Sequence, residues 1–155
     1  MSAIVARIVE VCVFRIDIAG PEYLLLKRSN DDKIYPGIWQ WITGSMRDTE
    51  SAAKAAVREL LEETGLKPRR LWVVPHVNSF YVEADDAVHL SPLFAVEVSS
   101  KDEPRISAEH ERHEWCRFDQ AREKLVWPGQ RRGLEIVHEY IAREGAAARL
   151  TQLTP

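Results

Sequence analysis

Short apolar runs and stretches of helical periodicity succeed one another along this chain. The apolar runs are rich in Val, Ile, Leu and aromatic residues, and Gly, Pro, Asn or Asp bounds most of them, which is typical of buried strands. They predict strands over residues 4–18, 23–28, 38–43, 71–82, 89–98 and 113–118. Because Gly20-Pro21 is a turn signal, the first two strands are expected to form a hairpin.

Two further segments carry apolar residues at helical spacing. The first covers residues 53–64, where Asp48 or Thr49 is expected to cap the start and Gly65 to supply the left-handed residue that ends it. The second runs from about residue 130 to 143 behind a Pro-Gly pair. Strands before, between and after two helices predict an α/β fold with a mixed sheet between helices.

The overall composition narrows the class of protein. A chain of 155 residues with 45% hydrophobic and 29% charged residues is expected to form one soluble domain. No apolar run approaches the roughly 20 residues that a membrane helix needs. The net charge of -3, without a block of Lys or Arg, argues against binding to duplex nucleic acid. Cys12 and Cys116 do not have the spacing of a metal site or a disulfide framework. Both are therefore expected to be free thiols in a reducing cytoplasm.

The end of the first predicted helix carries an acidic cluster. Glu59, Glu62 and Glu63 lie in its last turns, where the helix dipole disfavours negative charge. Like charges one turn apart cost a helix about 0.2–0.5 kcal/mol, so the cluster needs either good solvation or a cation. A solvated face, with Arg58 offsetting part of the repulsion, is one interpretation. A hard divalent cation bound by the carboxylates is the other.

The wider segment from Gly44 to Leu66 favours the metal interpretation. It fits the pattern G-x5-E-x7-R-E-U-x-E-E-x-G-U, in which U is apolar, at every specified position. This pattern is the Nudix box, so the chain resembles a Nudix hydrolase. The resemblance implies the family's α/β/α sandwich, here as a single domain over residues 1–155. It also implies hydrolysis of a nucleoside diphosphate linked to another group, with Mg²⁺, or alternatively Mn²⁺, as cofactor.

The resemblance assigns roles to residues of the box. The expected metal ligands are the Gly44 carbonyl and the carboxylates of Glu59, Glu62 and Glu63. Glu62 is also expected to be catalytic. Glycine at position 44 would let the backbone approach the ion closely. The catalytic set also includes Arg58 and Glu50, because a guanidinium fork is well suited to orient carboxylates.

A second acidic segment lies outside the box. Several Nudix families place a glutamate shortly before a tryptophan-containing strand, as a further metal ligand or general base. Glu109, six residues before Trp115, matches that position best, and Glu111 is the alternative. No cysteine or third histidine stands near His110 and His113 at zinc-ligand spacing, so both are interpreted as polar loop and strand residues.

Residues for substrate contacts are expected around the box. Lys27 and Arg28, at a strand end, are suited to bind phosphates, whereas Trp39 and Tyr81 offer aromatic faces to a base. The run from Trp39 to Gly44, WQWITG, resembles the W-Q-x-V-T-G run of dihydroneopterin triphosphate pyrophosphatases, which also accept dATP. This resemblance implies a small nucleoside-triphosphate-like substrate. The protein itself is expected to be a monomer or a homodimer, and the sequence does not distinguish the two.

Two alternatives stay open. Glu109-His110 before Trp115, with Tyr81 downstream of the box, also resembles the diadenosine tetraphosphate hydrolases. Those enzymes usually carry Pro-Lys before the box glycine, where this chain has Ile42-Thr43. The other alternative is a non-catalytic Nudix module that binds nucleotides. Degenerate modules usually lose the carboxylates that this chain retains.

Overall fold

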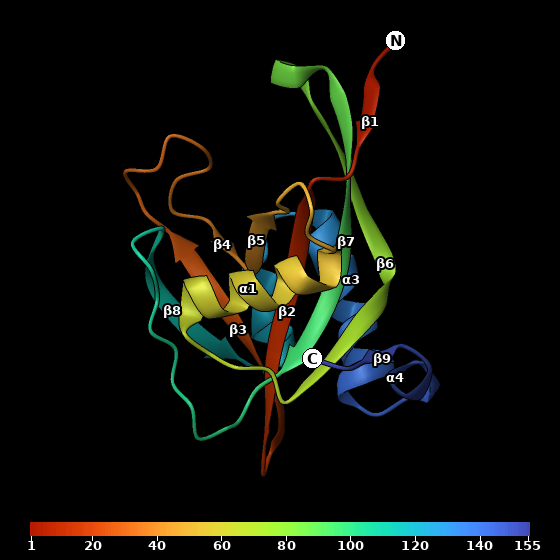
Figure 1. Ribbon diagram of the computed structural model, residues 1–155. Helices are drawn as coiled ribbons and strands as arrows, with labels where there is room; N and C mark the ends of the chain where they lie inside the picture. The colour runs from red at the N-terminus through yellow and green to blue at the C-terminus, as the bar shows by residue number, and fades with distance from the viewer.

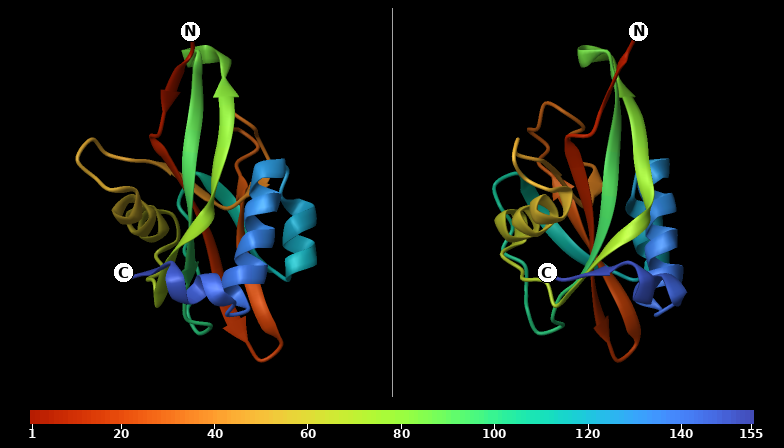
Figure 2. Two further views of the ribbon diagram at one scale, coloured as in Figure 1. Left: turned by 90° about the vertical axis from the view of Figure 1, so that its right-hand side faces the viewer. Right: turned by 45° about the vertical axis from the view of Figure 1, so that its right-hand side comes forward.

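A computed structural model describes all 155 residues as three layers. Helix α1 (Ala52–Thr64) covers one face of a mixed sheet, and α2 (Phe118–Lys124) and α3 (Pro128–Val137) cover the other, as Figures 1 and 2 show. The nine strands of the sheet are β1 (Ala3–Val5), β2 (Ile8–Asp17), β3 (Gly20–Arg28), β4 (Trp39–Gln40), β5 (Ile42–Ser45), β6 (Arg70–Val82), β7 (Ala87–Glu97), β8 (His110–Cys116) and β9 (Gln152–Leu153). The predicted α/β sandwich is confirmed.

Strand β2 organises the sheet. It pairs antiparallel with β3 and β5 on one side and parallel with β7 on the other. Strand β8 extends the sheet beyond β3, and β6 and β9 extend it beyond β7. The β2–β3 pair is the hairpin that the Gly20-Pro21 turn predicted. The combination of one parallel and several antiparallel neighbours makes the sheet mixed.

The apolar run in β2, which only Glu10 interrupts between Ile8 and Phe14, is nearly continuous because helices cover both faces of the sheet. Its residues alternate between two buried clusters. Cys12 and Phe14 belong to the cluster under α2 and α3, and Val11 and Val13 to the cluster under α1. The sheet therefore separates the molecule into two hydrophobic cores, one under α1 and one under α2 and α3.

The N-terminal prediction of one strand over 4–18 is wrong in one respect. The strand breaks at Ala6-Arg7, and the preceding piece, β1, pairs parallel with β7 instead of continuing β2. There it lies beside the long hairpin of β6 and β7, which projects beyond the body of the sheet (Figure 1). The short 3₁₀ helix η1 (Glu83–Asp85) forms the tip of this hairpin.

Helix boundaries also differ from the prediction. Ser51, not Asp48 or Thr49, caps α1, because its hydroxyl accepts a hydrogen bond from the Lys54 amide at 3.3 Å. Gly65 ends the helix with φ of 70°, as predicted.

The C-terminal region differs most from the prediction. The predicted helix over 130–143 is α3 followed by the π turn η2 (His138–Ala142), and α4 (Ala146–Leu150) comes after it. Phe118, expected to end a strand, begins α2 instead. None of these helices is long and apolar enough to span a bilayer.

Candidate metal centre and active site

Helix α1 turns part of its acidic cluster inward. Glu59 and Glu63 are 9% and 4% exposed, whereas Glu62 is exposed and Leu61 is 52% exposed. The small residues Ala55 and Ala56 are fully buried. The buried face of the helix therefore includes two carboxylates, which is costly unless a cation or hydrogen bonds compensate them.

Gly44 in β5 lies against Glu59. A Cβ atom at position 44 would stand only 2.1 Å from Cδ of Glu59 and 2.5 Å from its Oε1. No other residue type fits there without displacing this carboxylate. The glycine of the box is thus required by close packing and not by its backbone conformation.

Arg58 holds the carboxylates of the box in place. Its guanidinium donates two hydrogen bonds to Glu50, at 2.7 and 2.8 Å, and one to Glu59 at 2.7 Å. It also donates to Glu62 at 3.0 Å and to the Ser45 carbonyl at 2.8 Å. These are the carboxylate contacts that were expected of this residue, and all of its nitrogen atoms are engaged.

The two buried carboxyl groups have raised pKa values. Burial raises the pKa of Glu63 to about 9, and the nearby carboxylates Glu109 and Glu59 add to the rise. Burial also raises the pKa of Glu59, where the hydrogen bond from Arg58 opposes the effect. In contrast, the hydrogen bonds from Arg58 hold the pKa of Glu50 well below its ordinary range. Glu59 and Glu63 are thus buried acidic groups whose negative charge is disfavoured, whereas the charge of Glu50 is neutralised by Arg58.

The second acidic segment meets the first at Glu63. Ligand atoms of Glu63, Glu109 and His110 all lie within 4.8 Å of one another. Glu109 is exposed, and His110, the first residue of β8, is 6% exposed. Because burial also lowers the pKa of His110 to about 4, its imidazole is neutral at physiological pH. His110 is thus a strand residue, as the interpretation allowed, but it is buried and lies beside Glu63 and Glu109.

The predicted phosphate-binding cations lie near this cluster but have partners of their own. Lys27 forms an ion pair with Glu111 at 2.9 Å, which leaves Glu111 outside the group around Glu63. Arg28 pairs with Asp32 at 2.5 Å and donates to the Ile34 carbonyl at 3.0 Å. Its charge is close enough to Glu63 to lower the pKa of that carboxyl group.

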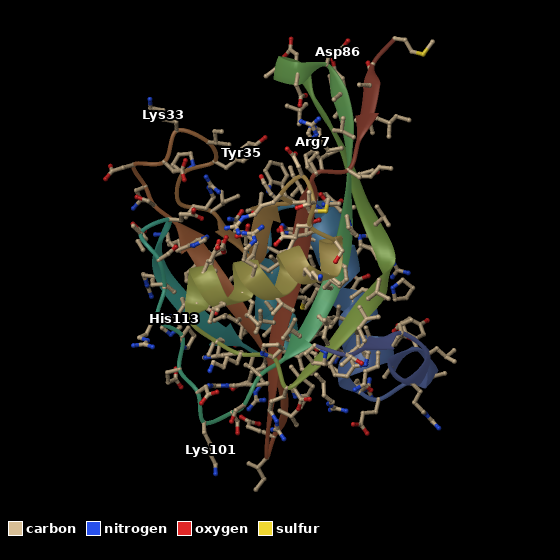
Figure 3. The ribbon with its side chains drawn as sticks, viewed as in Figure 1. Arg7, Lys33, Tyr35, Asp86, Lys101 and His113 are labelled. Atoms are coloured by element: carbon tan, nitrogen blue, oxygen red, sulfur yellow. The ribbon has the colours of Figure 1, made fainter.

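The two predicted aromatic contacts lie in different places. Trp39 pairs with Lys27 across β3 and β4, and the Lys124 ammonium lies 4.3 Å from its ring centre. Tyr81 is exposed near the end of β6, and its hydroxyl donates to Asp86 at 3.1 Å. Figure 3 shows Asp86 at the tip of the projecting hairpin, away from α1. The structure therefore does not bring Tyr81 to the box.

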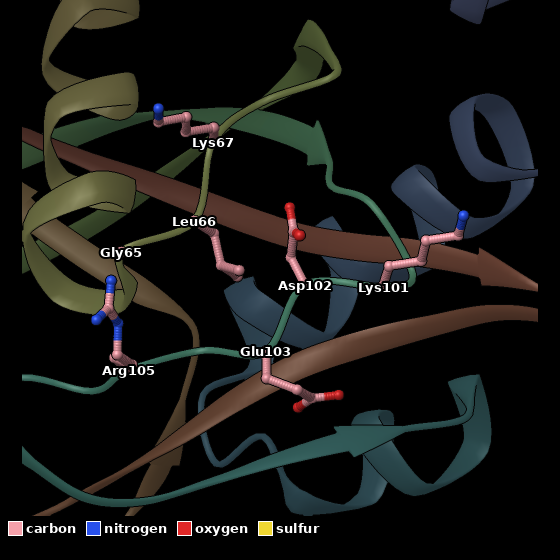
Figure 4. Close-up of a pocket in the computed structure, with 7 residues that line it drawn as sticks. All are labelled: Gly65, Leu66, Lys67, Lys101, Asp102, Glu103 and Arg105. Carbon is pink, nitrogen blue, oxygen red and sulfur yellow. The ribbon is translucent and has the colours of Figure 1, made fainter.

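A surface hollow of about 390 Å³ lies at the C-terminal end of α1 (Figure 4). It is lined by residues of both charges: Gly65, Leu66, Lys67, Lys101, Asp102, Glu103 and Arg105. None of the acidic residues of the box lines it. The chemistry of the site is therefore located by the carboxylate cluster and not by this hollow.

The family model described as the NUDIX domain matches residues 6–136, which include strands β2 to β8 and the carboxylate cluster. The chain belongs to the NUDIX domain family. The pairing of a complete box with the family's sandwich makes it a Nudix hydrolase.

Curated and solved relatives of this Nudix hydrolase differ in their described activities. An octanoyltransferase of Myxococcus xanthus is 38% identical over 120 residues, 72% of this chain, but the match spans only 31% of that protein. An asymmetrical bis(5'-nucleosyl)-tetraphosphatase of Sus scrofa is 27% identical over 139 residues, covering 85% of this chain and 88% of the relative.

Among solved structures, the E. coli dihydroneopterin triphosphate pyrophosphohydrolase aligns with a TM-score of 0.68 at 20% identity. The alignment covers 84% of this chain and 94% of that one. At this identity the likeness supports the Nudix fold and not a substrate.

The residues of this Nudix hydrolase fit a divalent metal ion. Oε2 of Glu63 is buried without a hydrogen-bond partner, beside Glu59 and Glu109. An unpartnered buried carboxylate oxygen is costly, and a cation would compensate it. The donors are mainly carboxylate oxygens, which Mg²⁺ and Mn²⁺ prefer. Glu59 and Glu63 would hold such an ion, with Glu109 beside Glu63 and Glu62 at the exposed rim.

Gly44→Ala is expected to lower the activity of this Nudix hydrolase by about tenfold to a hundredfold, the usual effect of disturbing a residue that supports a metal ligand. The added methyl group would displace Glu59 and break its 2.7 Å hydrogen bond with Arg58. Steady-state hydrolysis rates and thermal unfolding measure the change. Gly20→Ala is the control, because its Cβ would face open space and only its φ of 114° is strained. Unchanged activity of Gly44→Ala would contradict the close-packing argument.

Metal binding is expected to release a proton from Glu63. Its pKa of about 9 lies above its ordinary value of 4.5, so between these values folding takes up a proton. The contribution of Glu63 to the free energy of unfolding of the metal-free protein is therefore lost as the pH rises through this window. The metal needs the ionised form, so its apparent affinity rises with pH.

Calorimetric titration of Mg²⁺ between about pH 6 and pH 8, in buffers of different ionisation enthalpy, measures this proton release. In Glu63→Gln the side chain at position 63 cannot titrate. This variant is therefore the reference for proton release and for the pH dependence of the free energy of unfolding. Equal proton release by the wild-type protein and Glu63→Gln would show that another group is responsible.

Proposed function

We propose that this Nudix hydrolase is a metal-dependent pyrophosphohydrolase of a small nucleoside-triphosphate-like substrate, of the dATP or dihydroneopterin triphosphate type. The observation that carries the proposal is the buried, unpartnered Oε2 of Glu63 within a group of carboxylates. The WQWITG run before the box supports the substrate class.

Each residue of the site has a distinct part in the proposed reaction. Glu59 and Glu63 would hold Mg²⁺, and Arg58 keeps Glu59 and Glu50 in position through the hydrogen bonds it donates. The bound ion would neutralise charge on the phosphates and lower the pKa of a coordinated water. Glu109 would accept a proton from the attacking water, a role that its exposed position beside Glu63 supports. Lys27 and Arg28 exchange their carboxylate partners for substrate phosphates.

Diadenosine tetraphosphate hydrolysis is the alternative function. The tetraphosphatase of Sus scrofa covers most of the chain, and Glu109-His110 stands before Trp115 as that group has it. Ile42-Thr43 in place of Pro-Lys speaks against this function. A non-catalytic nucleotide-binding module is a weaker alternative, because Glu59, Glu62 and Glu63 are all retained.

A substrate panel separates these functions. Product release is measured with dATP, other nucleoside triphosphates, dihydroneopterin triphosphate and diadenosine tetraphosphate, with Mg²⁺ and with EDTA. The proposal predicts pyrophosphate and a monophosphate from triphosphates, with kcat/KM well above that for diadenosine tetraphosphate. Cleavage of diadenosine tetraphosphate alone would favour the alternative, and binding without turnover would favour the non-catalytic module.

A further inference from the structure

His110 is a buried imidazole with one unused nitrogen. The residue begins β8 and is 6% exposed. Its Nε2 lies 3.4 Å from the side-chain amide nitrogen of Gln40, whereas its Nδ1 is buried and has no hydrogen-bond partner. A buried ring nitrogen without a partner costs free energy that a bound group would recover. Nδ1 is therefore the atom of His110 that is free to bind such a group.

Glu63 carries a second unused atom in the same place. Ligand atoms of Glu63, Glu109 and His110 lie within 4.8 Å of one another. Oε2 of Glu63 and Nδ1 of His110 are both buried without a partner, so the two side chains do not satisfy each other. Ligand atoms that share one ion at about 2.1 Å each are at most about 4.2 Å apart. A small rotation of the side chains would thus bring these residues onto one cation.

The backbone fixes the position of His110 beside Glu63. The last carbonyls of a helix have no partner within the helix itself. The loop before β8 uses two of them in α1, because the Arg105 amide donates to the Thr64 carbonyl at 2.8 Å and the Ser107 amide to the Glu63 carbonyl at 3.1 Å. The His110 amide in turn donates to the Ser107 carbonyl at 3.2 Å. The loop therefore holds His110 against the end of the helix that carries Glu63.

The charges around His110 favour a cation. Three further carboxyl groups lie close enough to Glu63 to raise its pKa: Glu109, Glu59 and Glu62. The imidazole of His110 is neutral at physiological pH and adds no positive charge of its own. The positive charge of Arg28 is near both Glu63 and His110, but Arg28 is paired with Asp32. The site is thus acidic overall and offers one neutral nitrogen donor.

We propose that His110 supplies a nitrogen ligand to the divalent metal ion of this site, together with Glu63. The inference rests on the proposed function and deepens it, because it gives the site mixed nitrogen and oxygen donors. Imidazole suits first-row transition ions, whereas carboxylates suit both Mg²⁺ and Mn²⁺. The donor set therefore fits Mn²⁺ better than Mg²⁺. Mg²⁺ still binds through the carboxylates and gains little from His110.

Gln40 can hold His110 in the tautomer that metal binding needs. A ligating histidine carries its proton on the nitrogen that the metal does not use, and that N–H usually donates to an oxygen. In His110 this nitrogen would be Nε2, which the Gln40 amide already faces. A half-turn of the amide places its oxygen there as the acceptor and leaves the lone pair of Nδ1 free.

Pulsed EPR of Mn²⁺ bound to the wild-type protein tests the inference directly. A coordinated imidazole nitrogen couples magnetically to Mn²⁺, and oxygen ligands give no nitrogen coupling. We expect a ¹⁴N coupling that is replaced by a ¹⁵N coupling when only the histidines are labelled with ¹⁵N. His76, His89 and His138 do not compete, because each is hydrogen-bonded to a group outside this site. Absence of a histidine nitrogen coupling would overturn the inference.

His110→Gln assigns the nitrogen to one residue. The variant is expected to lose the coupling and to bind Mn²⁺ at least about tenfold more weakly, since loss of even an outer partner of a metal ligand has that effect. Its affinity for Mg²⁺ is expected to change little. His113→Gln, on the same strand but outside the group, is the matched control and is expected to keep the coupling and both affinities.

Calorimetric titration with each ion measures the affinities, and thermal unfolding in EDTA shows whether the variants are folded. A nitrogen coupling that survives in His110→Gln, or equal losses of Mn²⁺ and Mg²⁺ affinity, would overturn the assignment. If His110→Gln does not fold, the ¹⁵N-histidine measurement on the wild-type protein decides the question.

Failure of this inference is distinguishable from failure of the proposed function. Metal-dependent hydrolysis without a nitrogen coupling to bound Mn²⁺ would overturn the role of His110 and leave the proposed function intact. A protein that binds neither Mn²⁺ nor Mg²⁺ would overturn the proposed function, and the inference with it.

Discussion

Glu63→Gln is expected to lower kcat/KM about a thousandfold, because a metal ion contributes several kcal/mol to stabilising the transition state and each 1.4 kcal/mol is worth tenfold. Glu63 lies at the centre of the cluster, since its carboxyl group adjoins Glu59, Glu109 and His110. Glutamine keeps the shape of the side chain but cannot supply a charged ligand. Initial rates over a range of Mg²⁺ concentrations measure the loss and show whether more metal restores activity.

The same change is not expected to destabilise the metal-free protein. Oε2 of Glu63 has no hydrogen-bond partner to lose, and an amide has no charge to desolvate. Thermal unfolding in EDTA therefore separates a catalytic role from a structural one. Glu123→Gln on α2 is the control, because Glu123 is exposed and lies outside the cluster. Near-normal turnover by Glu63→Gln would show that the metal ligands have been misassigned.

Arg58→Lys is expected to have the second-largest effect, a loss of about tenfold to a hundredfold in activity together with a higher Mg²⁺ requirement. The lysine keeps the positive charge but has no planar fork, so it cannot bind Glu50 with two parallel hydrogen bonds and also reach Glu59 and Glu62. The carboxylates of Glu59 and Glu62 would then be less well positioned to hold a metal ion.

Arg47→Lys is the matched control for this variant. Arg47 contacts Glu62 at 3.3 Å, but its side chain is 67% exposed, so the pair contributes little. The Mg²⁺ concentration that gives half-maximal rate is measured for both variants. If the two behave alike, charge alone matters and the fork of Arg58 has no special role.

Much of the fold follows from the sequence because its signals are local. The apolar run of β2 and the Gly20-Pro21 turn predicted a buried hairpin, and Gly65 predicted the end of α1. Helix α2 was missed because its seven residues are too few to establish a helical period. The break at Ala6-Arg7 depends on pairing between β1 and β7, which are more than 80 residues apart in the sequence.

The candidate site also has a part that the sequence predicts and a part that only the fold reveals. The box is contiguous, so its carboxylates and Arg58 could be named from the sequence, although their functional roles stay predictions. The sequence does not show that Glu63 meets His110, because this contact needs the loop before β8 to pack against α1.

The central claim is that the carboxylates of the box use a divalent metal to cleave a phosphoric anhydride. Its most direct test is chromatographic quantification of products from a nucleoside triphosphate, with EDTA-treated protein and again after Mg²⁺ is restored. The account predicts no turnover in EDTA, recovery with Mg²⁺, and a monophosphate with pyrophosphate as products. Turnover that persists in EDTA, or that Glu63→Gln matches at saturating Mg²⁺, would contradict it.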